Sequence, residues 1–293
     1  MQLLFKINAS LLICFGLGSA AIGWHASAVL QENAKREVIG NARLMMEAAL
    51  TARTYTTQEI KPLLEKLMLQ QFMPQSVPSY AATQSFSSLR ATYPDFSYKE
   101  AALNPTNPRD RVVEWEADLV QKMRDHPEGK ELIGERMGTT GAGLFLARPI
   151  RISDAKCLAC HSTPGAAPAT MLAQYGNNNG FGWKLNEIIG AQIVTVPLEV
   201  ALRQADRTVK SIMIGTVAIF GATLLLVNLL FYLLVLRPIK RISRVADAVS
   251  EGQSGVAHFT IKGTDEIATL SVAFNRMRRS LEKAMSLLAQ GQP

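Results

Sequence analysis

The sequence predicts a mixed α+β domain between two transmembrane helices, followed by an all-α coiled-coil module. Two apolar stretches, near residues 7–30 and 212–236, divide the chain. The part between them mixes helical periodicity with strand-like segments. After the second stretch, apolar residues recur alternately three and four positions apart, as in coiled coils. The boundaries we expect are a first helix over 1–30, an exported domain over 31–209, a second membrane helix over 210–236 and the module over 237–293.

The second apolar stretch predicts a membrane span. Residues 212–236 contain no charged side chain. At 1.5 Å rise per residue, a helix of this length crosses a hydrocarbon core of ~30 Å. The alternative is a buried helix of a soluble domain, but soluble cores rarely supply so long an unbroken apolar run.

The first stretch is interrupted by glycines and ends near Trp24, which suits a membrane–water interface. We expect it to be a retained span, in which Cys14 is a small buried hydrophobe. The alternative is a cleaved signal peptide with Lys6 at its charged start and the cleavage site at 26–28. In both cases the segment after residue 30 is exported.

Charge predicts the orientation. The basic residues Arg237, Lys240, Arg241 and Arg244 directly follow the second span, so this end is expected in the cytoplasm. Residues 31–209 then lie in the periplasm, and the protein is a two-pass protein of a bacterial inner membrane. The net charge of +7 fits a membrane surface, and the chain contains no nucleic-acid motif, so no nucleic-acid partner is expected.

The exported part begins with helical periodicity over residues 31–72, which Pro62 is expected to interrupt near Thr56 and Thr57. The Pro- and Ser-containing stretch 74–88 is expected to be a loop. A second helix is expected to start with Asn107 as its N-cap and Pro108 at its first position. The expected strands, with a glycine-containing turn over 138–142 between the first two, are 132–137, 143–152 and 191–196.

Cys157, Cys160 and His161 form a C-x-x-C-H motif, the signature of c-type haem attachment. The two thiols add to the porphyrin vinyl groups, and the adjacent His becomes the proximal iron ligand. We therefore expect one covalent haem c. A structural zinc site needs about four ligands, and the exported part has no third Cys. A thiol redox pair is the other alternative. Trp183 and Tyr175 are candidates to line the haem, although core packing is the simpler expectation.

The sixth iron ligand has several candidates. Met is an established partner of His on haem iron, and the pair Met45 and Met46 on the long helix is the first choice. The alternatives are an open position, water or a gas, and His126. Arg148 and Arg151 precede the motif and are either bidentate partners of the haem propionates or solvated residues of a strand edge.

The C-terminal part predicts two helices that pack through narrow apolar seams. The seam positions are 239, 242, 246 and 249, then 267, 270, 274, 277, 281, 284 and 288. A connector containing Gly252, Gly255 and Gly263 separates the two segments. Narrow seams need a partner, so we expect a parallel homodimer that forms a four-helix bundle. An ordinary amphipathic hairpin is the alternative.

Two resemblances follow from these residues. Residues 237–239 (RPI) and 265–267 (DEI) resemble a HAMP module. Residues 104–116 (NPTNPRDRVVEWE), 146–161 (LARPIRISDAKCLACH) and 180–197 resemble exported haem-c sensor domains catalogued as domain of unknown function 3365. The resemblance implies a PAS-like fold that holds haem through the C-x-x-C-H motif. Some relatives use a Cys on the first long helix as distal ligand. This chain has no Cys there, and Met45 and Met46 stand near that place.

Together these features indicate a transmembrane receptor that senses redox state or a small ligand through its haem and relays the change through HAMP. It is not expected to be an enzyme. The alternative function is a membrane-anchored electron-transfer cytochrome, and a third is peroxidase-like catalysis at an open iron. No catalytic output domain fits into residues 237–293, so the expected partner is a separate cytoplasmic signalling protein.

Overall fold

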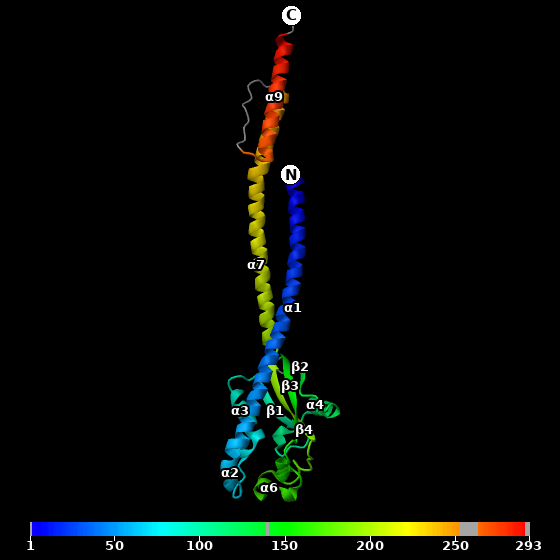
Figure 1. Cartoon of the computed structure of the whole chain (residues 1–293), viewed down its shortest axis with the longest axis vertical. Helices are drawn as coiled ribbons and strands as arrows, with labels where there is room; N and C mark the ends of the chain where they lie inside the picture. Colours follow the sequence, from blue (N-terminus) through cyan, green and yellow to red (C-terminus); the bar gives the residue numbers. More distant parts are fainter. Residues whose placement is uncertain (1, 139–140, 252–262, 291–293) are drawn as a thin grey trace. The chain divides into compact units, whose positions relative to one another are not determined.

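The computed structural model describes residues 2–138, 141–251 and 263–290. The chain forms two compact units, one of residues 22–210 and one of residues 1–21 with 211–293. Figure 1 shows the succession of elements from the N-terminus in blue to the C-terminus in red.

The first helix, α1, extends from Gln2 to Tyr55. It continues through a π-helical turn, η1 (Thr56–Ile60), into α2 (Lys61–Met68). Pro62 lies in the first turn of α2, where its missing N–H is tolerated. The predicted interruption near Thr56 is therefore confirmed, as a π-helical turn within continuous helix.

The prediction of a loop over residues 74–88 is wrong. This stretch forms a short 3₁₀ turn, η2 (Pro74–Ser76), and the helix α3 (Pro78–Leu89). Pro78 occupies the first helical position, which favours a helix start rather than a loop. Ala82 and Phe86 lie one turn apart on α3 and are buried in the core. Tertiary burial of one face thus decides the structure of a polar stretch.

The predicted start of the second helix at Asn107 is also wrong. Asn107 caps only a 3₁₀ turn, η3 (Pro108–Asp110). The helix α4 (Glu114–Asp125) begins later, where the Glu116 carboxylate accepts a hydrogen bond of 2.9 Å from the backbone N–H of Val113. The side chain at the third position of the helix therefore satisfies the donor at its start.

Four antiparallel strands form one sheet, in the order β1-β4-β3-β2. Their bounds are β1 (Ser97–Ala102), β2 (Leu132–Gly138), β3 (Gly141–Arg151) and β4 (Ile188–Pro197). The three predicted strands are confirmed, whereas β1 was missed. Residues 139–140 of the predicted turn lie outside the described residues.

Helices cover both faces of this sheet. On one face, α1 contributes Val38, Ala42, Met46 and Ala49 to a core shared with Leu144, Leu146, Val194 and Val196. On the other face, α4 contributes Leu119, Val120 and Met123, which pack against Ala147, Ala191 and Ile193. Alternate residues of β3 and β4 therefore face different helices, as the strand period requires. The predicted α+β domain is confirmed.

Two helical stretches, Leu4–Met68 and Glu199–Ser250, are long and apolar enough to cross a membrane. The second consists of α7 (Glu199–Phe231), a π-helical turn η6 (Tyr232–Leu236) and α8 (Arg237–Ser250). The rings of Phe15 and Phe220 stack at 3.4 Å between centroids. Two candidate membrane helices thus flank the α+β domain in the sequence, as predicted.

The C-terminal helices are α8 and α9 (Glu266–Gln290). Ile242 and Phe274 are buried together, with Val245 and Ala246 packed against them. Other apolar seam positions on α9, Leu270, Met277 and Leu281, remain exposed in the single chain. Gly252 and Gly255 of the predicted connector, and the side chain of Leu288, lie outside the described residues.

Candidate functional site

The C-x-x-C-H motif lies on two short consecutive turns, η4 (Ala155–Cys157) and α5 (Leu158–His161). Asp154 starts the first turn by accepting a hydrogen bond of 2.8 Å from the backbone N–H of Lys156. Cys157 is exposed and Cys160 is half-buried, and both are free thiols. Residues three apart in a helical turn lie on the same side, so the two sulfurs are available to one planar group.

The imidazole of His161 is fixed through one of its nitrogens. Nδ1 lies 2.7 Å from the backbone carbonyl oxygen of Gly180. A carbonyl only accepts, so Nδ1 carries the proton and the lone pair of Nε2 is left for a metal. Burial lowers the pKa of His161, and the hydrogen bond to Gly180 partly offsets this effect. The ring is thus held neutral, in the tautomer that an axial ligand of iron requires.

A second contact sets the plane of that ring. The indole of Trp183 stacks on His161 with centroids 3.9 Å apart and planes 16° apart. Trp183 also donates its backbone N–H to the carbonyl of His161, over 3.3 Å. Trp183, for which core packing was the simpler sequence expectation, therefore lies directly at the motif.

The loop that carries Gly180 is tied to the segment 104–107. Gly180 N–H donates to the Asn104 side chain over 3.2 Å, and Asn104 donates in return to the Phe181 carbonyl. Gly180 has a φ of +84°, and a Cβ there would lie 2.0 Å from Oγ1 of Thr106. Only glycine fits this position, which explains how the loop can present its carbonyl to His161.

The end of the α1–α2 stretch lies against the segment that follows the motif. Thr170 donates a hydrogen bond of 2.9 Å to the backbone carbonyl of Met68. The ring of Phe72 meets that of Tyr175, on α6 (Ala169–Tyr175), edge to face at 5.7 Å. Burial raises the pKa of the Cys160 thiol, and the positive charge of Lys61 on α2 offsets part of this rise.

A buried polar network lies on the α1-facing side of the sheet. Arg53 of α1 donates to Oε2 of Glu100 on β1, and Tyr98 donates to its Oε1 over 2.7 Å. Gln192 of β4 donates to the Tyr98 hydroxyl over 3.1 Å. Burial and the Glu100 charge raise the pKa of Tyr98, so it remains protonated. This network was not predicted from the sequence, because β1 was not expected.

The two arginines singled out by the sequence both have protein partners. Arg148 pairs with Glu47 at 2.7 Å and with Glu131 at 3.4 Å. Arg151 donates to the backbone carbonyls of Pro127 and Asn186, over 2.6 and 3.1 Å. Both arginines line an open groove of about 570 Å³, together with Leu50, Gln192 and residues 127–130. A groove of this volume is in the range of cofactor sites. Their contact with haem propionates remains a prediction.

Met46 is fully buried in the apolar core between α1 and the sheet, and Met45 is partly buried against that core. Their described contacts are with core side chains, whereas Met68, farther along this helical stretch, accepts the hydrogen bond from Thr170 in the segment after the motif. A role for Met46 or Met45 as sixth ligand remains a prediction.

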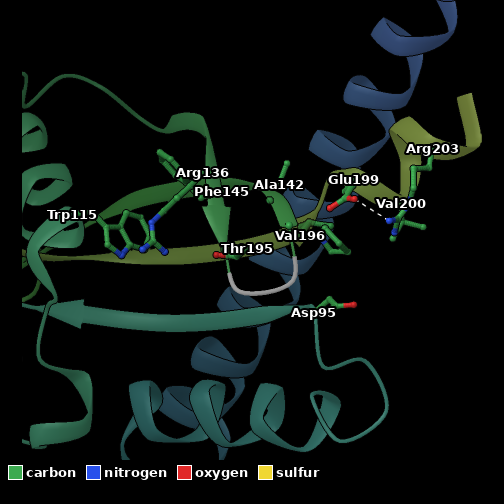
Figure 2. A pocket seen from close by; sticks show the side chains of 14 residues that line it. Asp95, Trp115, Arg136, Ala142, Phe145, Thr195, Val196, Glu199, Val200 and Arg203 are labelled. Atoms are coloured by element: carbon green, nitrogen blue, oxygen red, sulfur yellow. Dashed lines mark hydrogen bonds and ion pairs between the residues drawn. The ribbon is translucent and has the colours of Figure 1, made fainter. Parts of the chain in front are cut away.

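A second, smaller cavity of about 100 Å³ lies at the β2–β3 hairpin and the start of α7 (Figure 2). Arg136 lies over the Trp115 ring at 4.5 Å, and Glu199 pairs with Arg203 at 2.9 Å. Cofactor and ligand sites usually measure 300–1,000 Å³, so this cavity is too small for a porphyrin.

Two known families match parts of the chain. The Tll0287-like family matches residues 31–197, and the HAMP domain family matches residues 230–283. No curated protein matches the chain. Among solved structures, the chain is similar to the crystal structure of the cyanobacterial heme-protein Tll0287, with 17% identity and a TM-score of 0.43. That match covers 55% of this chain and 95% of the other.

Proposed function

The chain belongs to the Tll0287-like family and carries a HAMP domain, and on that premise we propose that it is a membrane receptor that senses redox state or a small ligand through one covalent haem c. A HAMP domain indicates transmembrane signal transduction, and a solved protein with this family's name is titled a heme-protein. The covalent attachment, the stimulus and the site residues are our proposal.

The observation that supports it best is the state of His161 beside two free thiols. Cys157 and Cys160 are available for thioether bonds, and His161 offers Nε2 while Gly180 holds Nδ1. Such a hydrogen bond from the second ring nitrogen orients an axial ligand and raises its basicity. A bound haem would supply one-electron chemistry and a coordination position at its iron.

Other residues would assist this group. Trp183 limits rotation of the imidazole through its stacking at 3.9 Å. Arg148 and Arg151 line the open groove and would pair with propionates as bidentate donors. Met46 or Met45 is the proposed sixth ligand, and an open position is the alternative.

The proposed topology places residues 31–209 in the periplasm and residues 237–293 in the cytoplasm, with spans over 1–30 and 210–236. α7 begins two residues after β4 ends and continues into the second span, so a shift of the sheet would be passed along this helix. In a parallel homodimer the HAMP helices would switch between two packings and signal to a separate cytoplasmic protein. Changing the ratio of the two HAMP packings from 10:90 to 90:10 needs a stimulus that favours one packing over the other by ~80-fold in affinity, which is about 2.6 kcal/mol.

Haem attachment is tested by producing the full chain in a bacterium with c-type maturation machinery. Purified protein should show a c-type pyridine haemochrome and keep its haem on a denaturing gel. The variant C157A/C160A should lose the covalent haem, whereas C14A, which removes the third cysteine, should retain it. H161A should retain the thioether bonds but change the optical spectrum. Colourless wild-type protein, or pigment extracted by acid acetone, would overturn the proposal.

Redox sensing is tested separately through HAMP. Crosslinking the HAMP helices in opposite packings should change the haem potential by roughly 110 mV, the one-electron equivalent of that population shift. A change of less than about 20 mV would remove the basis for redox sensing. Deleting residues 238–293 distinguishes the receptor from the alternative, a membrane-anchored electron-transfer cytochrome. The cytochrome would still transfer electrons after this deletion, whereas the receptor would no longer signal.

A further inference from the structure

A buried ion pair ties the end of α1 to the sheet. Arg53 lies in the last turn of α1, and Glu100 lies on β1. The Glu100 side chain is only 3% exposed and that of Arg53 27%. Tyr98 donates to the second carboxylate oxygen of Glu100, and Gln192 donates to Tyr98 in turn. Every member of this network is therefore held in place by another member.

The network borders the open groove proposed for the haem propionates. Gln192 donates to the Tyr98 hydroxyl and also lines that groove, and Leu50, three residues before Arg53 on α1, lines it as well. Burial lowers the pKa of Arg53, but the charge and hydrogen bond of Glu100 outweigh it, so the pKa is raised and the guanidinium keeps its charge. A haem whose propionates lie in this groove would thus be within the electric field of this pair.

Opposite charges in a poorly hydrated site affect an iron in opposite directions. Ferric haem carries one positive charge more than ferrous haem. A fixed cation therefore favours the ferrous state, and a fixed anion favours the ferric state. Such effects are stronger in a protein interior than in water because the effective dielectric constant is lower.

We propose that Arg53, held by Glu100, tunes the haem potential upward and transmits the change of haem charge to α1. This inference rests on the proposed haem attachment. The step is the transfer of one electron from an external one-electron donor to the iron. No bond forms or breaks, and no proton moves. Coupling between two sites is reciprocal, so a charge that stabilises one oxidation state of the iron is itself stabilised in that state. The free energy of the Arg53–Glu100 contact therefore differs between the ferric and the ferrous protein.

The contact lies on an element that can carry the signal. α1 is one helix from Gln2 to Tyr55, and its N-terminal part is a candidate span. Through Arg53, the last turn of this helix forms an ion pair with Glu100 of β1. A change in the strength of the pair would therefore act on the same helix that enters the membrane.

The test uses the full chain in nanodiscs, loaded with haem, with potentials measured by mediated optical titration at one pH. At the wild-type midpoint, R53Q should lower the ratio of ferrous to ferric haem about tenfold, a shift of ~59 mV. E100Q should raise this ratio, also by about tenfold. In R53Q/E100Q the two effects should largely cancel, to within about threefold of wild type. R53K should keep the wild-type potential.

A matched control is available on the same helix. Lys35 of α1 pairs with Glu135 of β2 at 2.6 Å, about five turns before Arg53, or ~27 Å at 1.5 Å per residue. K35Q and E135Q should leave the potential unchanged, because the field of an exposed pair at that distance is screened.

The outcomes separate this inference from the haem proposal. If wild-type protein has no haemochrome, the haem proposal fails first. If haem is present and neither single variant shifts the potential, the role of Arg53 is wrong. If R53Q and E100Q shift it in the same direction, a loosened site is the cause, and the inference is again overturned. If R53Q does not fold, because Glu100 is left buried without its cation, E100Q alone must still raise the potential.

Discussion

Asn8 and Asn228 exchange two side-chain hydrogen bonds, of 2.9 and 2.8 Å. The first residue lies in α1 and the second in α7, each within a candidate membrane span. Amide groups in hydrocarbon have no water to bond, so a reciprocal pair fixes one axial register of the two helices. Asn228 donates as well to the carbonyl of Leu224 in its own helix, over 2.8 Å.

Breaking this pair should destabilise the helix packing in a coupled way. N8L or N228L should each cost roughly 0.6–2 kcal/mol, because each leaves the other amide without its partner on the facing helix. The double variant N8L/N228L should cost less than the sum. Unfolding in detergent micelles would give the coupling energy as a double-mutant cycle. S10A is the control, since the Ser10 hydroxyl bonds the Lys6 carbonyl of its own helix. Strict additivity of the two Asn variants would contradict a pair.

Met46 should behave as a core residue. It is fully buried between α1 and the sheet, so M46A should destabilise the domain by ~2–5 kcal/mol. M46L fills nearly the same volume and should cost less than about 1.5 kcal/mol. Denaturant unfolding measures both, with L44A at the exposed neighbouring position as a control within about 0.5 kcal/mol.

M46L also tests the proposed sixth ligand without disturbing the core. Leucine has no sulfur, so the ferric haem spectrum of M46L should change if the thioether binds iron. M45L is the matched comparison. Unchanged spectra in both variants would exclude Met46 and Met45 as ligands.

The stability of the domain should depend on acid through Glu131. Partial burial raises the pKa of Glu131, but the hydrogen bonds and charges of Arg43 and Arg148 outweigh it and hold the pKa below its ordinary value of 4.5. A carboxylate with a lowered folded-state pKa contributes stability above its unfolded pKa and loses it as pH falls through the folded pKa. Unfolding curves between about pH 5 and pH 3 should therefore fall less steeply with acid in E131Q. R43Q should weaken the same dependence, and an unchanged slope in both variants would contradict this role.

Trp183 should hold the orientation of the His161 ring. The two rings stack at 3.9 Å, and aromatic pairs contribute ~0.5–1.5 kcal/mol beyond buried area. W183L should therefore broaden the electron paramagnetic resonance lines of ferric haem, because the imidazole samples more orientations. W183F retains a stacking face and should stay close to wild type. If W183L gives lines as narrow as wild type, the stack does not orient the ligand.

Local sequence was sufficient for much of this architecture. The three predicted strands and the two C-terminal helices follow from periodicity within one segment. The motif residues Cys157, Cys160 and His161 are consecutive in a short turn, so their proximity needs no tertiary information. Errors arose where a local signal is ambiguous. α3 was taken for a loop, although Ala82 and Phe86 bury one face of it, and β1 was missed because only β4 supplies its pairing.

The sequence by itself determined the apolar candidate membrane helices, the two helices of the HAMP domain and the thiol–imidazole motif, because each is encoded in neighbouring residues. Tertiary structure alone decided what surrounds that motif. The Gly180 carbonyl and the Trp183 ring both come from a loop later in the chain. The positive φ of Gly180 and the sheet pairing of Glu100 become visible only when the chain has folded, since long-range packing creates both.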